Sequence, residues 1–158
     1  MSHPAFPYVP GHCALRKGRS SIPGYVYLIT ATTARRAPLF ADFKTGCVAS
    51  SAFTRSSVIG RNRLLAWVLM PDHVHWLLEL GGGEDLAKSI GRMKAVSARE
   101  VRRLSGWEDE VWAQAFHDRT LRREEDIVAV ARYIVANPLR AGLARTVREY
   151  SFWGAAWL

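Results

Sequence analysis

Residues 64–80 read LLAWVLMPDHVHWLLEL and hold two apolar runs with a turn signal between them. The runs are residues 64–70 and 74–80, and Pro71 and Asp72 separate them. Proline suits the second position of a tight turn and cannot donate a hydrogen bond within a strand ladder. The stretch therefore predicts a β-hairpin, and the rest of the fold is built outward from it.

One strand and one helix are expected before this hairpin. Residues 25–30 are rich in aromatic and β-branched side chains, which predicts a strand. Over residues 39–58, apolar residues recur at steps of three and four, which predicts a helix packed on one face. The chain before the hairpin thus contributes a β-α unit.

Another helix, a strand and a last helix are expected after the hairpin. Glycines at 81–83 break the chain, and residues 111–118 alternate weakly, which predicts a strand. The last helix should end near Asn137, because Pro138 disfavours helix at the residue before it. We expect these residues to open that last helix: Glu124, Glu125 and Asp126. In the first of the two helices, these residues can face the core: Leu86, Ile90, Met93 and Leu104.

The element order β-α-β-β-α-β followed by a helix is that of a ferredoxin-like fold. We therefore predict an α+β protein with an antiparallel sheet and added helices. A length of 158 residues suits a single domain. We place its limits at residues 24–145, with an N-terminal arm over 1–23 and a C-terminal tail over 146–158.

The chain is strongly basic, which bears on its partners. Lysine and arginine number 22 against 14 aspartates and glutamates, a net charge of +8. Such an excess favours a polyanion such as nucleic acid, although a merely soluble basic protein has the same composition. Part of the charge lies in the arm, at Arg16, Lys17 and Arg19, and part on the helix that begins near residue 86. Both segments are candidate contacts to a phosphate backbone.

The sequence gives no sign of a membrane or secreted protein. It has two cysteines, too few for a disulfide scaffold, and no apolar run near the length of a membrane span. The first residues lack the apolar core of a secretion signal. We expect a cytoplasmic protein without membrane contact.

His73 and His75 are the first candidate chemical residues. Alternate strand side chains share a face, so both imidazoles point to one side of the predicted sheet and Val74 to the other. Two neutral imidazoles beside a turn can hold a divalent metal with open coordination positions. A pair of histidines bonded only within the turn is the alternative.

Tyr133 and Asn137 form a second candidate group. Their four-residue step makes them neighbours on one helix, on the flank of the core stripe. A phenol ordinarily ionises only near pH 10, but a metal and a phosphodiester held in line would permit its attack on phosphorus. The amide oxygen of Asn137 is a hard ligand suited to Mg²⁺ or Mn²⁺. A packing tyrosine and a helix-end asparagine are the alternatives.

Three motifs together resemble those of HUH single-tyrosine transposases. They are MPDHVH at 70–75, YIVANPLRAGL at 133–143 and RKGRS at 16–20. The subgroup most similar is the REP-associated tyrosine transposases, relatives of the IS200/IS605 enzymes. The resemblance covers nearly the whole chain in matching order.

The resemblance implies a specific role for each residue. His73 and His75 would be metal ligands for Mg²⁺ or Mn²⁺, Asn137 the third ligand, and Tyr133 the nucleophile that forms a 5′-phosphotyrosine. The substrate would be single-stranded DNA folded as a hairpin, such as a REP element, so the protein would associate with the nucleoid. A monomer is expected, with a dimer as the alternative. The following residues would contact DNA: Arg16, Lys17, Gly18, Arg19, Ser20, Arg122 and Arg140.

Two alternative functions remain, and the roles of His117 and of the C-terminal tail are further hypotheses. The protein could bind hairpin DNA or RNA without cutting it, or it could be a phosphohydrolase in which His73 and His75 activate water. His117, just before the tyrosine helix, belongs either to a phosphate-binding group or to a capping cluster. The hypothesis for the tail is that Trp153 and Trp157 dock near the site and control DNA access.

Overall fold

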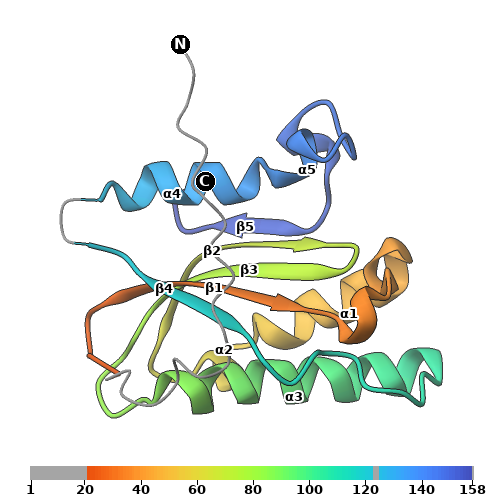
Figure 1. The fold of residues 1–158 in the computed structure, drawn as a ribbon, viewed down its shortest axis with the longest axis horizontal. Coiled ribbons are helices and arrows are strands. Elements are labelled where there is room, and N and C mark those ends of the chain that lie inside the picture. The colour runs from red at the N-terminus through yellow and green to blue at the C-terminus, as the bar shows by residue number, and fades with distance from the viewer. Residues whose placement is uncertain (1–20, 123–124, 158) are drawn as a thin grey trace.

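The structure is a computed structural model that describes residues 21–122 and 125–157. Its centre is a five-stranded antiparallel sheet in the order β4-β1-β3-β2-β5 (Figure 1). The strands are β1 (Val26–Thr32), β2 (Arg63–Met70), β3 (His73–Glu79), β4 (His117–Thr120) and β5 (Trp153–Ala155). The first four strands have the ferredoxin-like order, so the predicted fold class is confirmed.

Helices cover both faces of the sheet. They are α1 (Phe43–Phe53), α2 (Ser56–Ile59), α3 (Leu86–Ser105), α4 (Ile127–Val135) and α5 (Asn137–Arg140), with short 3₁₀ turns at Ala34–Arg36, Leu39–Ala41 and Val147–Glu149. Figure 1 shows α1 and α3 on one side of the sheet and α4 on the other. The sheet therefore separates two apolar cores.

The predicted hairpin is β2 and β3, and its side chains divide cleanly between the two cores. Val74, Trp76 and Leu78 are buried against α1 and α3, whereas Leu77 is buried against α4. Since side chains alternate along a strand, His73 and His75 lie on the α4 side with Leu77. The turn between the strands brings Met70 opposite His73.

The predicted helix over 39–58 is wrong in its extent. A 3₁₀ turn comes first, and α1 begins at Phe43 because the carboxylate of Asp42 accepts hydrogen bonds from the Thr45 N–H and hydroxyl. The helix ends at Phe53, where the Thr54 hydroxyl donates to the Ser50 carbonyl at 2.6 Å. Residues 56–59 form the separate helix α2.

Two further expectations need correction after the hairpin. Leu104 does not face the core, because it lies in the last turn of α3 before the chain reverses at Gly106, and it is 48% exposed. The strand predicted over 111–118 is β4 at His117–Thr120 instead. Val111 and Trp112 are buried core residues, and the Trp112 indole donates to the Ser97 hydroxyl at 3.0 Å. Trp112 also forms an isolated antiparallel β-bridge with Thr33, so this segment pairs next to β1 at one residue before the chain reaches β4.

The last helix also differs at both ends. It begins at Ile127, because Asp126 caps it by accepting from the N–H groups of Val128 and Ala129. Glu125 lies before the helix and accepts from Arg119 and from the Arg122 N–H. Pro138 does not end the helical region, because it stands in the first turn of α5, where its missing N–H needs no partner.

Residues 146–158, expected as a tail, contribute a strand that the sequence did not predict. β5 pairs with β2 through Ala155, Gly154 and Trp153. The Tyr150 hydroxyl donates to the Leu69 carbonyl at 2.6 Å, and burial raises the pKa of Tyr150 to about 12, which keeps it protonated. The segment therefore completes the sheet, which favours a structural role over control of DNA access. No helix in the described part of the chain could span a membrane.

Phe152 anchors this segment against α1, which yields a stability prediction. A Cβ atom at Gly46 would lie 2.7 Å from the buried Phe152 ring. We expect Gly46→Val to lower the free energy of unfolding by about 1–3 kcal/mol, measured by urea denaturation, because the ring would be displaced.

Gly91 on α3 provides the matched control. A Cβ there meets no heavy atom of the described residues within 4 Å. Gly91→Ala should therefore raise the free energy of unfolding by up to about 1 kcal/mol, through helix propensity alone. Equal effects of the two substitutions would contradict the packing of Phe152 on Gly46.

Candidate active site

The two histidines of β3 form the centre of the candidate site. Their ring centroids are 5.0 Å apart, and the rings are nearly perpendicular. The Nδ1 atom of His75 is 2.9 Å from the Thr30 hydroxyl, and the Nδ1 atom of His73 is 2.7 Å from an Asp72 carboxylate oxygen. Both rings are therefore oriented through Nδ1, which leaves Nε2 as the nitrogen each can offer to a metal.

His75 is held in its neutral form. Burial, together with the electrostatic effects of His73 and of Arg140, lowers the pKa of His75 to about 3. A neutral imidazole is the form that binds a metal ion. The environment of His75 thus favours ligation throughout the physiological pH range.

The turn that carries His73 is fixed by the loop after β1. The N–H and hydroxyl of the buried Thr33 both donate to the Asp72 carbonyl, at 2.9 and 3.1 Å. The Arg36 guanidinium lies 3.4 Å from the second Asp72 carboxylate oxygen. Arg36 has a φ of 56°, a conformation uncommon for a residue other than glycine. Asp72 thus connects an arginine to the first histidine.

Tyr133, Asn137 and Arg140 form a compact group where α4 meets α5. Val130 and Ile134 bury one side of α4 against the sheet and leave Tyr133 43% exposed. The Arg140 guanidinium lies 3.9 Å from the centre of the Tyr133 ring and donates to the Asn137 side-chain oxygen at 2.7 Å. Because α4 packs on the face of the sheet that Leu77 shares with His73 and His75, this group lies on the side that holds the histidines.

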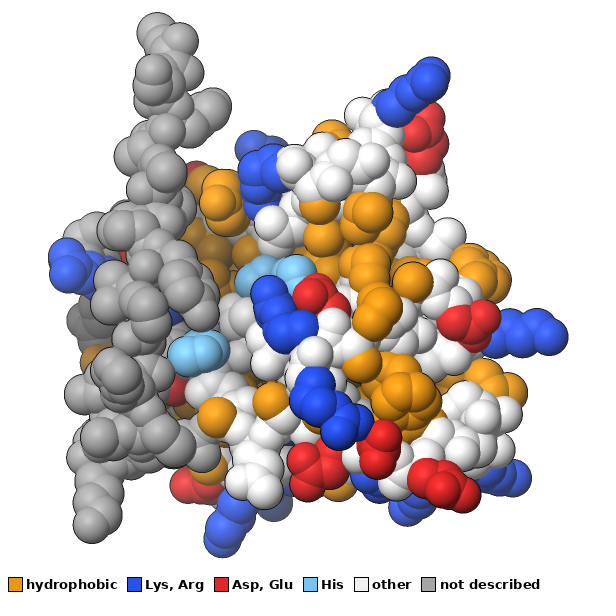
Figure 2. Space-filling view, turned by 45° about the vertical axis from the view of Figure 1, so that its right-hand side comes forward, with side chains coloured by type: hydrophobic (Ala, Val, Ile, Leu, Met, Phe, Trp, Pro, Cys, Tyr) orange, Lys and Arg blue, Asp and Glu red, His pale blue; other side chains and the backbone are white. Residues whose placement is uncertain are grey.

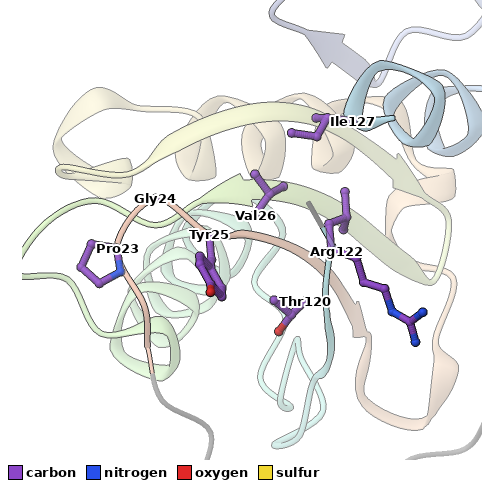
Figure 3. A pocket seen from close by; sticks show the side chains of 8 residues that line it. Pro23, Gly24, Tyr25, Val26, Thr120, Arg122 and Ile127 are labelled. Carbon is purple, nitrogen blue, oxygen red and sulfur yellow. The ribbon is translucent and has the colours of Figure 1, made fainter. Parts of the chain in front are cut away.

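The other predicted DNA contacts fall elsewhere. Arg16, Lys17, Gly18, Arg19 and Ser20 lie outside the described residues. Arg122 lines a cavity of about 730 Å³ with Tyr25, Thr120 and Ile127 (Figure 3). The cavity lies where β1 begins, whereas His75 pairs with Thr30 near the end of β1.

Two further predicted groups have definite positions. His117 pairs with Thr30 on the side away from His75, so it shares their face of the sheet but is separated from His75 by β1. The basic helix α3 packs on the opposite face and does not line the histidine site. The basic residues of α3 therefore do not contact the candidate site.

The sequence of this chain matches one known protein family. The family described as "Transposase IS200 like" matches residues 23–137. The chain belongs to this family. The matched residues include both histidines, Tyr133 and Asn137. The resemblance predicted from the motifs is thereby confirmed at the level of the family.

Relatives and solved structures agree with the assignment to the IS200-like transposases. A Haemophilus influenzae protein named as a REP-associated tyrosine transposase is 24% identical over 98 residues, which are 56% of this chain and 56% of that protein. The chain thus matches about half the length of this relative. A solved REP-associated tyrosine transposase bound to a REP hairpin gives a TM-score of 0.68 at 22% identity, over 85% of this chain and 79% of that one.

A second solved structure has the same fold. It is a protein from Deinococcus radiodurans described as a transposase, with a TM-score of 0.51 at 21% identity. The similarity covers 76% of this chain and 95% of that chain. At these identities the two structures establish the shared fold.

The donor atoms of this IS200-like transposase fit a divalent ion. Two oriented imidazoles offer Nε2, and the Asn137 side-chain oxygen stands on the same side of the sheet. Within residues 21–122 and 125–157, no three His, Cys, Asp or Glu side chains gather as a metal-binding group. An ion here would therefore take two nitrogens and an amide oxygen and leave positions for phosphate and water. Figure 2 shows histidine side chains reaching the surface beside charged ones.

Sequence reasoning missed three residues that orient this site: Thr30, Asp72 and Arg36. A carboxylate directly before His73 in a turn was the one local signal, because a metal-bound histidine commonly donates its second ring nitrogen to a carboxylate. Thr30 comes from another strand, so only the pairing of β1 with β3 reveals its contact with His75.

Proposed function

We propose that this IS200-like transposase cleaves and rejoins single-stranded DNA at REP-type hairpins, with Tyr133 as the nucleophile. The observation that carries the proposal is that the histidine pair of β3 and helix α4, which bears Tyr133, lie on the same face of the sheet, with Asn137 following in α5. The similarity to a transposase solved with a REP hairpin supports the choice of substrate.

In the proposed reaction, His73, His75 and Asn137 hold a Mg²⁺ or Mn²⁺ ion. When bound, the ion polarises the scissile phosphate and stabilises the charge that develops on it. The Tyr133 oxygen forms a bond to phosphorus, and the bond from phosphorus to the 3′ oxygen breaks. The phenol loses its proton, and the departing oxygen gains one and becomes a 3′-OH.

The covalent step explains how strands could be rejoined. A phosphotyrosine keeps the energy of the phosphodiester, so attack by a 3′-OH restores the DNA without ATP. All of the proposed groups come from one chain, with Tyr133 on α4 packed over the strands of its own sheet.

The test uses imperfect hairpins with randomised single-stranded flanks, labelled at the 3′ end. Wild-type protein with Mg²⁺ or Mn²⁺ should give a labelled adduct that survives denaturing electrophoresis, together with a fragment that a polymerase extends from its 3′-OH. A fully paired duplex of the same length should give neither product. Hairpin binding without any adduct would instead indicate a binding module, and a labelled fragment without protein would indicate a phosphohydrolase.

A further inference from the structure

Arg140 contacts both Asn137 and Tyr133, which have different roles in the proposed reaction. One guanidinium nitrogen donates to the Asn137 side-chain oxygen at 2.7 Å and to the Tyr133 carbonyl at 2.6 Å. The guanidinium carbon lies 3.9 Å from the centre of the Tyr133 ring. The proposed third metal ligand and the proposed nucleophile are thus held by the same cation.

This contact opposes metal binding. The oxygen that Arg140 holds is the one that Asn137 would offer to a divalent ion, and an ion at that oxygen would lie close to the positively charged guanidinium. Like charges at such short range repel each other even near the surface of a protein. In the absence of DNA, the metal must therefore compete with Arg140 for Asn137.

A phosphate reverses this competition. Guanidinium groups bind phosphate oxygens through two parallel hydrogen bonds, a stronger contact than one to an amide oxygen. Arg140 is exposed, and its guanidinium lies 3.9 Å from the centre of the Tyr133 ring. A phosphate placed for attack by Tyr133 would therefore lie close to this guanidinium. Once Arg140 moves to the phosphate, Asn137 is released and the repulsion is offset by the negative charge of DNA.

We propose that Arg140 couples metal binding to DNA binding by exchanging Asn137 for the scissile phosphate. The inference rests on the proposed function, because it requires both the metal site and the DNA site. Coupling between two ligands is reciprocal, so DNA tightens the metal as much as the metal tightens DNA. The exchange delays assembly of the complete metal site until a strand is in place.

The experiment measures Mn²⁺ affinity by electron paramagnetic resonance, in a Tyr133→Phe background that retains the ring under Arg140. A saturating hairpin oligonucleotide should tighten Mn²⁺ by about 10-fold or more, within the usual range of such couplings. Adding Arg140→Gln should tighten Mn²⁺ about 5-fold or more without DNA and reduce the effect of DNA to less than about 2-fold. Unchanged Mn²⁺ affinity and unchanged coupling in Arg140→Gln would overturn the proposal.

Three further variants make the result decisive. Arg132→Gln removes an exposed arginine from α4, the helix that carries Tyr133, and should alter neither quantity. Arg140→Lys keeps the charge but not the two-pronged donor, so its Mn²⁺ affinity and coupling should lie between those of the parent and Arg140→Gln; values equal to the parent would count against the proposal. If His73→Ala leaves Mn²⁺ binding intact, the proposed metal site itself is wrong, whatever Arg140 does.

Discussion

Tyr133→Phe is expected to abolish the covalent protein–DNA adduct and to leave hairpin binding within about 2-fold of wild type. The substitution removes only the phenolic oxygen, and the ring that Arg140 covers at 3.9 Å remains. Since Tyr133 is 43% exposed and the buried side of α4 is unchanged, the fold should be retained. A nucleophile that forms the intermediate has no substitute in a phenyl ring, so the loss should be about 10³-fold or more. Denaturing gels measure the adduct, and fluorescence anisotropy measures binding.

Tyr25→Phe is the matched control for this loss. Tyr25 is also a partly exposed tyrosine, at 37%, but it lies just before β1 and lines the cavity at the far end of that strand from Thr30. Its substitution should leave adduct formation unchanged. An adduct that persists in Tyr133→Phe would assign the nucleophile to another residue.

The parts of the fold that the sequence predicted are those with strong local signals. The β2–β3 hairpin has a proline turn between two apolar runs, and strand alternation placed His73 and His75 on one face. β5 has only three residues and exists because β2 offers an edge to pair with, so no local pattern predicted it. The strand was predicted too early in the sequence because Val111 and Trp112 are buried and Trp112 forms only an isolated β-bridge with Thr33, whereas the regular pairing of β4 begins at His117.

In the candidate site, too, some residues could be predicted from the sequence and others only from the structure. Spacing made His73 and His75, and likewise Tyr133 and Asn137, candidates that share a face, and the family motifs supplied the roles expected of them. What orients them comes from distant parts of the chain, such as the Thr30 hydroxyl on His75, and could not be read along the sequence. Arg140 was predicted as a DNA contact, whereas the structure shows that it also donates to Asn137, three residues earlier in α5. The basic residues of α3 were equally visible, yet the sheet separates them from the site.

The position of the candidate site limits the face of the protein from which DNA can reach it. The site is confined to the α4 face, with the Arg140 group at one end of β1 and the Arg122 cavity at the other. In the proposed reaction, the strand to be cleaved would lie on the α4 face, opposite to the face that α3 covers.

His75→Ala and His73→Ala are expected to remove the metal dependence together with the cleavage. Each loses an imidazole that is already oriented, by Thr30 at 2.9 Å and by Asp72 at 2.7 Å. With one ligand gone, cleavage of the labelled hairpin should fall about 10²–10³-fold, in line with the loss of a preorganised electrostatic group. Mn²⁺ affinity should fall in parallel, and chelation with EDTA should abolish wild-type cleavage until Mg²⁺ or Mn²⁺ is restored.

His117→Ala and Thr30→Val test whether a loss of Mn²⁺ affinity comes from losing a metal ligand or from any substitution on this face of the sheet. His117 lies across β1 from His75 on the same face, so its loss should leave Mn²⁺ affinity unchanged. Thr30→Val keeps both imidazoles and removes only the hydroxyl that orients His75, so Mn²⁺ should weaken about 10–100-fold, less than with either alanine. If His117→Ala weakens Mn²⁺ as much as His75→Ala, the ion is held by a different set of residues. Cleavage that resists EDTA would show that the histidines serve a reaction without a metal.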